Sequence, residues 1–248
     1  MNKVFYLFSC VFIYLNSFGQ PNLFTPSHIE IPLLTSSEDS QIALSLNMEY
    51  FYSLKDVNPC EFYIDLPFFQ DTNLTLYLEA FNAYTNDFQL LRSAQNGLIY
   101  DDYEPIIKSF RIKNSDGWTG SISLMKNYLI GVLKKNGNVY EIKYIDNNTY
   151  VLFDVNKSIA ESNFSCQTND SDITLPTNTN QPDQMIGGAE CLEMGIEIDY
   201  YTFTQFGDNC YDAVEWALAL LAGVSEVYMA ELNDMVELQA RYINVWEV

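Results

Sequence analysis

The sequence has almost no histidine and few basic residues. His28 is the only histidine among 248 residues, which excludes a three-histidine metal site and a helix with two histidine ligands within this chain. We expect His28 itself to be a surface residue rather than a ligand. Twelve Lys and Arg stand against 33 Asp and Glu, giving a formal net charge of −21. Nucleic acids and anionic membranes are bound through clustered cations, so we expect neither as a partner.

Long apolar runs are also missing, apart from one at the N-terminus. Residues 1–20 are typical of a secretory signal peptide, with Lys3 before an apolar run from Val4 to Leu15 and small residues near Gly19. That run is too short to cross a bilayer core of roughly 30 Å. A lipoprotein anchored through Cys10 is an alternative, although its apolar stretch would be very short. We expect a secreted, extracellular protein with no membrane attachment once the signal is removed, since no later segment looks able to span a membrane.

No C-x-x-C pair is present, which excludes a zinc ribbon. The cysteines after the signal peptide are Cys60, Cys166, Cys191 and Cys210. Disulfides persist in the oxidising compartments that exported proteins reach, so two disulfides are expected, with all three pairings open. The alternative is that at least one thiol is free and has a function.

The spacing of apolar residues predicts a β-rich region. Residues 22–60 are polar and mixed, and we expect them to be weakly structured, with one or two strands. Between residues 61 and 155, apolar and polar positions alternate in short runs separated by turn residues, which is the pattern of half-buried strands. Asn136-Gly137 is the clearest hairpin signal, because both residues tolerate a positive φ. The prediction is an antiparallel domain built from meanders.

A polar segment, 167–189, has the composition of a linker, and the pattern then changes. Alternation over 191–199 predicts a strand, spacings of three and four over 212–230 predict an amphipathic helix capped near Asn209, and alternation returns over 236–246. Strand, helix and strand form the start of a βαβ unit. Two strands and one helix do not close a core, so we expect this unit to be truncated at Val248. The predicted class is α+β, with a β-rich domain at 21–166 and an incomplete α/β unit at 190–248.

The predicted elements of both regions follow one another in an order that is similar to a known enzyme family. The features are a first strand at 193–199, a loop at 200–203, a helix ending at 224–228, a strand closing in Val245-Trp246, and the earlier segments 120–124, 129–132 and 140–142. In this order they resemble the reprolysin/ADAM-like zinc metalloendopeptidases, a branch of the metzincins. The resemblance implies a propeptide at 21–166, an activation linker at 167–189 and the N-terminal part of a metzincin-like catalytic domain at 190–248.

The resemblance further implies a zymogen whose full-length form hydrolyses protein or peptide substrates with a zinc-activated water, while the propeptide contacts the catalytic domain within the same molecule. The family's zinc motif, H-E-x-x-H-x-x-G-x-x-H, is absent, so we expect this chain alone to be inactive. By the resemblance, Cys166 could ligate the zinc in the zymogen, although its neighbours lack the usual Pro/Lys/Gly context. Glu193 could help to bind a structural calcium.

Two other interpretations remain open. The chain could be a secreted, non-catalytic β-rich binding module that is complete as written, or a pseudoenzyme that has lost its catalytic part. A paired-carboxylate site from Glu197 and Asp199, which are two positions apart, is a weaker possibility than an ordinary strand surface.

Overall fold

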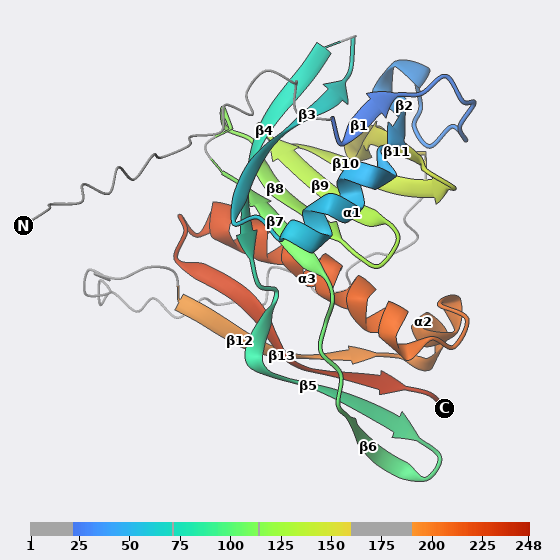
Figure 1. Ribbon diagram of the computed structural model, residues 1–248, viewed down its shortest axis with the longest axis vertical. Coiled ribbons are helices and arrows are strands. Elements are labelled where there is room, and N and C mark those ends of the chain that lie inside the picture. The colour runs from blue at the N-terminus through green and yellow to red at the C-terminus, as the bar shows by residue number, and fades with distance from the viewer. Residues whose placement is uncertain (1–21, 71, 114, 160–189) are drawn as a thin grey trace, which may run out of the picture.

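The computed structural model describes residues 22–159 and 190–248, except for residues 71 and 114. The signal peptide predicted at 1–20, the linker predicted at 167–189 and Cys166 therefore lie outside the described residues. The described strands form one sheet of nine strands and one of four, and helix α3 (Cys210–Glu231) lies between them (Figure 1).

The nine-stranded sheet is antiparallel throughout and curls until its edge strands contact each other. It encloses a core that includes Leu44, Leu76, Ile122 and Tyr150. The alternating pattern of residues 61–155 correctly predicted strands here, because each strand buries one face in this core. In spatial order the strands are β1 (Phe24–Pro26), β2 (Gln41–Leu46), β11 (Thr149–Asp154), β10 (Asn138–Asp146), β9 (Leu129–Lys135), β8 (Thr119–Leu124), β7 (Lys108–Ile112), β4 (Thr72–Phe81) and β3 (Glu61–Phe68).

Two local predictions are confirmed by the backbone. Asn136 and Gly137 have φ angles of 51° and 81° and join β9 to β10, with Lys135 opposite Asn138. Asn209 caps α3, because its side-chain oxygen accepts hydrogen bonds from the backbone N–H groups of Tyr211 and Asp212 at 3.1 and 3.3 Å. Both are short-range effects. The Asn209 side chain satisfies backbone N–H groups at the helix start, and Gly137, which has no side chain, tolerates a positive φ.

Of the expectations for residues 22–60, the presence of one or two strands is confirmed, and the weak structure is wrong. These residues contain β1, β2, the short 3-10 helix η1 (Glu38–Ser40) and helix α1 (Met48–Val57). Asn47 caps α1, and Phe51 and Leu54 on one face of the helix are buried in the core of the large sheet. The apolar residues of this segment are interspersed with polar ones, and the large sheet supplies a surface on which several of them are buried. A second 3-10 helix, η2 (Val155–Lys157), follows β11.

The four-stranded sheet combines strands from distant parts of the sequence. Its order is β12 (Glu190–Ile198), β13 (Val236–Trp246), β5 (Tyr84–Ala94) and β6 (Gly97–Asp101). After β4 the chain leaves the large sheet, forms the β5–β6 hairpin beside β13, and returns at β7 (Figure 1). β13 is parallel to both of its neighbours, whereas β6 is antiparallel to β5. Short helix α2 (Tyr200–Gln205) connects β12 to α3.

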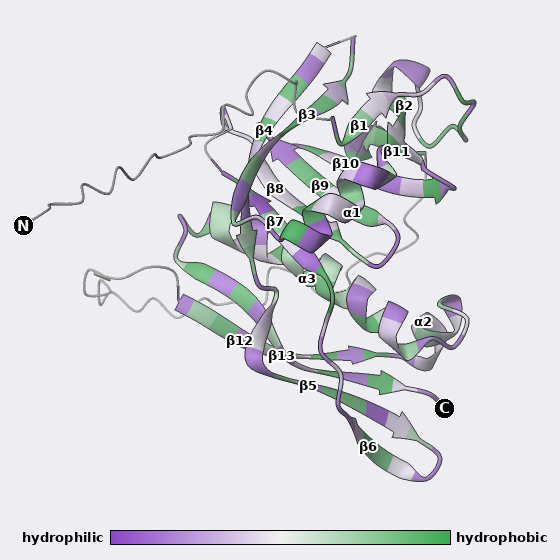
Figure 2. Ribbon diagram, viewed as in Figure 1, coloured by the Kyte–Doolittle hydropathy of each residue, from purple (hydrophilic) through white to green (hydrophobic). Residues whose placement is uncertain are grey.

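Helix α3 is the common support of both sheets. It packs on β13 and β12 on one side and on β8, β7 and β9 on the other. Within the described residues it is the one helix long and apolar enough to cross a membrane by length and composition, which corrects the expectation that no later segment is. Most of its apolar stretch is buried between the sheets, and core helices of this kind are apolar nearly all round. Figure 2 shows apolar residues along the helix and on the strands that face it.

The predicted fold class, α+β with the start of a metzincin-like domain, is wrong. The protein is mostly β, and its large antiparallel sheet is nearly closed. Residues 190–246 do form strand, helix and strand, but the β5–β6 hairpin completes their sheet and the large sheet covers α3. The segment does not close a core by itself, but residues 22–159 supply the rest, so the truncation inferred from its two strands and one helix does not follow. Leu90 from β5 is buried in the same cluster as Leu218, Ile243 and Val245.

Candidate functional site

Extensive polar and apolar contacts lie where residues 22–159 meet residues 190–248. We call this region the interface. Its backbone part is the ladder between β5 and β13, in which Leu90 lies opposite Ile243 and Leu91 opposite Asn244. The ladder is extended at both ends, since Ala240 N donates to Ala83 O at 2.8 Å and Glu247 N donates to Ser93 O at 3.0 Å. Backbone hydrogen bonds therefore join the two segments from Ala240 to the end of β13 and one residue beyond it.

A buried charge cluster forms the polar centre of the interface. Arg111 on β7 contacts two carboxylates of the C-terminal segment: its Nη2 lies 2.7 Å from Glu237 Oε1, and its Nε lies 3.3 Å from Glu226 Oε1. The guanidinium also stacks on the ring of Phe81, with 4.3 Å from Cζ to the ring centroid. Arg111 and Glu226 are only 6% exposed. One cation is thus shared between two acids, where solvent screens little of the interaction.

Glu226 is the less well paired acid of this cluster. The 3.3 Å contact with Arg111 is an ion-pair distance without hydrogen-bond geometry, and Glu226 Oε1 has no hydrogen-bond partner among the described residues. Burial raises the pKa of Glu226 to about 7; the charge of Arg111 opposes this rise, and Glu237 adds to it. A carboxyl in this state changes charge near neutral pH.

A second buried acid lies near the other end of α3. Glu215 Oε1 accepts hydrogen bonds from the hydroxyl of Tyr103 and, at 2.8 Å, from the backbone N–H of Ile106. Burial raises the pKa of Glu215, while these two hydrogen bonds lower it. The ring of Tyr103 stacks on Tyr211, with centroids 4.7 Å apart. Since Tyr103 and Ile106 belong to the connection from β6 to β7, Glu215 fixes that connection to the helix.

Ion pairs at the rim of the interface add contacts that stabilise the protein less than the buried ones do. Arg92 on β5 reaches Glu247 at 2.6 Å and Asp101 at 3.3 Å, and Arg241 on β13 reaches Asp87 on β5 at 3.0 Å. Such exposed or partly exposed pairs typically contribute less than about 1 kcal/mol each.

The structure does not bring the predicted site residues together. Glu193 pairs with Arg241, Glu197 accepts a hydrogen bond from Trp246 Nε1 at 3.2 Å, and Asp199 caps α2 by accepting from Thr202 N at 2.7 Å. Glu197 and Asp199 therefore hold different partners and form no acid/base pair. His28 is exposed. No group of three or more His, Cys, Asp or Glu that could hold a metal occurs within the part of the chain that the structure describes. The roles suggested for Cys166 and Glu193 stay predictions.

The expected pair of disulfides is absent. Two disulfides among four cysteines would have to join two of Cys60, Cys191 and Cys210, and all three are free. Cys60 and Cys191 are exposed, whereas Cys210 is buried at the start of α3. Burial raises the pKa of the Cys210 thiol to about 11, so almost none of it is thiolate at neutral pH.

We expect this difference to appear in thiol titration. In chain expressed from residue 21 with Cys166→Ser, two thiols should react within minutes with an aromatic disulfide reagent at pH 8, and the third only after urea is added. The matched control is Cys210→Ser, which should lose the slow thiol alone. Fewer than three thiols in urea would show that a disulfide exists after all.

Sequence reasoning did not find the polar centre of the interface. Arg111 lies within a run identified only as a strand, and Glu215 and Glu226 lie within a helix described by its apolar positions. One signal was available. The two glutamates are eleven residues apart, or about three helical turns, so they share a face of a helix that is otherwise rich in Ala, Leu and Val. Isolated charges on an apolar helix point to buried partners elsewhere in the chain.

Comparison of the chain with models of protein families, with curated proteins and with solved structures finds no match. The resemblance to the reprolysin/ADAM-like enzymes therefore stays a prediction from the sequence.

Proposed function

We propose that this chain belongs to the precursor of an exported zinc endopeptidase, and that residues 22–159 act in it as a propeptide that holds residues 190–248 in place. The observation that carries the holding role is the shared sheet: β5 and β6 supply two of the four strands on which α3 rests. The support for zinc-dependent peptide hydrolysis is the order of sequence features that resembles the family. Zinc itself would be bound by residues that this chain lacks.

The interface gives the holding role a physical basis. The segment at 190–248 offers a long apolar helix and a strand with an unpaired edge, both of which would be prone to aggregation alone. The hairpin β5–β6 pairs that edge, Arg111 forms ion pairs with two of the segment's acids, and β8 covers the second side of α3. These three contacts would support the folding of residues 190–248, as the proposed propeptide role requires. Cutting the chain between the segments would leave all of them intact.

The holding role is tested by cutting the chain. A recognition sequence for a site-specific endoprotease is inserted between residues 175 and 180 of the chain expressed from residue 21. After cleavage we expect both pieces to elute together in size-exclusion chromatography at pH 7.5 and to separate only in denaturant. The uncut protein is the control for elution volume. Separation of the pieces in buffer alone would contradict the holding role.

The enzymatic part is tested by reading the gene beyond codon 248. An open frame with the three-histidine motif supports the precursor. A stop codon contradicts the enzymatic part and leaves the result of the cutting experiment standing.

A secreted, non-catalytic binding module is the second candidate. The observation in its favour is that α3 and its sheet are closed by residues of this chain alone, with Val214, Ala222 and Ile243 fully buried. A single cooperative unfolding transition that includes exposed Trp246 is expected under this interpretation. A separate early transition of the C-terminal segment would count against it.

A further inference from the structure

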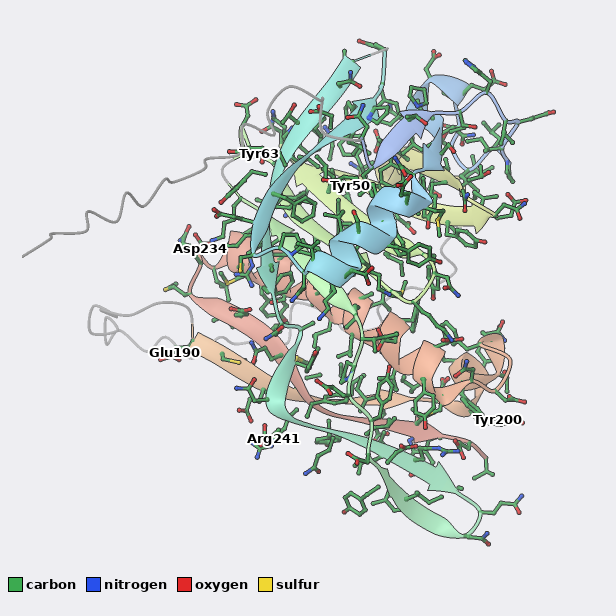
Figure 3. All side chains as sticks on the ribbon, viewed as in Figure 1. Tyr50, Tyr63, Glu190, Tyr200, Asp234 and Arg241 are labelled. Carbon is green, nitrogen blue, oxygen red and sulfur yellow. The ribbon has the colours of Figure 1, made fainter. Side chains whose placement is uncertain are left out.

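One edge of the four-stranded sheet is open beside an apolar groove. Within the described residues β12 pairs only with β13, so its other side presents unpaired backbone N–H and C=O groups. Next to this edge lies a groove of about 350 Å³ between β12 and α3. Its floor and walls are mostly apolar and include Met194, Ile196, Trp216, Leu220 and Val224. Figure 3 shows Glu190 and Tyr200 near the two ends of β12.

The side chains of β12 alternate between this groove and the opposite face of the sheet. Met194 and Ile196 lie beside Ala240 and Ile243, which are buried against α3. Glu193 and Glu197 are at the odd positions and lie on the other face, where Glu197 meets Trp246. A strand that paired with β12 would have the same alternation, with one set of side chains in the groove and the other beside the glutamates.

The charges along this edge favour one kind of occupant. Four acids lie on β12 or directly after it: Glu190, Glu193, Glu197 and Asp199. Among the described residues, only Glu193 of these four forms an ion pair, which it makes with Arg241. The sequence has no Lys or Arg between Lys157 and Arg241, so neither α2 nor α3 adds a basic residue. A second copy of this acidic edge would be repelled. A basic strand would find opposite charges across the ladder.

We propose that β12 and the adjacent groove bind an extended peptide segment of a partner protein in which apolar and basic residues alternate. The segment adds to β12 as a fifth strand. Its apolar side chains enter the groove beside Met194 and Trp216, and its basic side chains lie beside Glu193 and Glu197. Main-chain hydrogen bonds provide the affinity, and the alternation provides the specificity. This inference is independent of the enzymatic proposal.

The test uses the chain from residue 21 and a fluorescein-labelled octapeptide of alternating valine and lysine. We expect anisotropy to show saturable binding that weakens as NaCl rises from 50 to 300 mM. Two control peptides separate the contributions: glutamate in place of lysine should abolish binding, and proline in place of the two central valines should weaken it at least tenfold. Equal binding of the proline peptide would overturn strand addition.

Two variants of equal charge locate the site. Met194→Lys places a cation in the groove and should weaken binding at least tenfold. Val227→Lys adds the same charge on an exposed part of α3 that lines a different hollow, facing Val132, and should change affinity less than twofold. Equal effects of both variants, or no effect of Met194→Lys, would show only general attraction to an acidic protein and would overturn the proposal.

If Met194→Lys fails to fold, Glu197→Gln replaces it, since this change keeps the shape of an exposed side chain. It should weaken binding about threefold and reduce the salt dependence, whereas Glu38→Gln, in η1 of the N-terminal region, should do neither. Unchanged affinity and salt dependence in Glu197→Gln would contradict the charge pairing. Concentration-dependent dimerisation of the chain without peptide binding would assign the edge to a second copy and overturn the proposal.

Discussion

Replacing Arg111 with methionine should destabilise the protein by about 3–5 kcal/mol at pH 8, the cost typical of leaving a buried ion pair without one partner. Arg111 is the cation within contact of both Glu226 and Glu237 at the centre of the interface. Methionine has a similar length and keeps apolar contact with Phe81, so the loss reports the charge rather than a cavity. Urea unfolding followed by tryptophan fluorescence measures the change in free energy.

Lys113, a more exposed cation whose charge also acts on Glu226 but more weakly than that of Arg111, provides the control for this change. It follows β7 two residues after Arg111, but its pair with Glu79 spans 3.8 Å and both side chains are more than a third exposed. Lys113→Met should therefore change stability by less than about 0.5 kcal/mol. The cut protein offers a second measurement, in which Arg111→Met should let the two pieces separate at a lower urea concentration. If both substitutions cost the same, Arg111 does not hold the interface.

The contrast between β5 and the strands of the large sheet shows how far the sequence determines this fold. Strands β8 to β11 follow one another with tight turns, so local alternation and the Asn136-Gly137 turn were sufficient to predict them. β5 pairs with β13, about 150 residues later, and its alternation is interrupted by Asn86 and Asp87. No sequence pattern near β5 indicates that it pairs with β13, because the contacts that stabilise this pairing form only between distant residues of the folded chain.

The candidate site shows the same difference between contacts that are local in the sequence and contacts between distant residues. Asn209 and Asp199 cap helices through contacts with residues two or three positions away, and only the Asn209 cap was predicted. The charge cluster joins β7, α3 and β13, and no spacing in the sequence relates Arg111 to Glu226 and Glu237. A family resemblance suggested catalytic and metal roles, whereas the side chains brought together here hold two segments of one chain to each other.

Replacing Glu226 with glutamine should stabilise the protein at pH 8 by about 2–3 kcal/mol and leave its stability nearly unchanged at pH 4.5. The reason is the direction of the pKa shift. Burial raises the pKa of Glu226 from 4.5 to about 7. Between these values the folded protein binds the proton more tightly than the unfolded chain, so the free energy of unfolding falls as pH rises. Glutamine stays neutral at every pH, so the free energy of unfolding no longer falls as pH rises, while Arg111 keeps its contact with Glu237.

Glu231→Gln is the control on the same helix. Its carboxylate is exposed, and the hydrogen bond from Lys134 lowers its pKa, so it is ionised in both states above pH 6. The stability difference between this variant and the parent should therefore be flat from pH 6 to pH 8, whereas the difference for Glu226→Gln should grow over the same range. Urea unfolding at half-unit pH intervals separates the two profiles. Parallel profiles would mean that Glu226 is already charged at pH 6, with Arg111 fully compensating its burial. The cost of Arg111→Met would then still be smaller at pH 5 than at pH 8, because the buried Glu226 takes up a proton more readily once Arg111 is removed, so one set of titrations checks both substitutions.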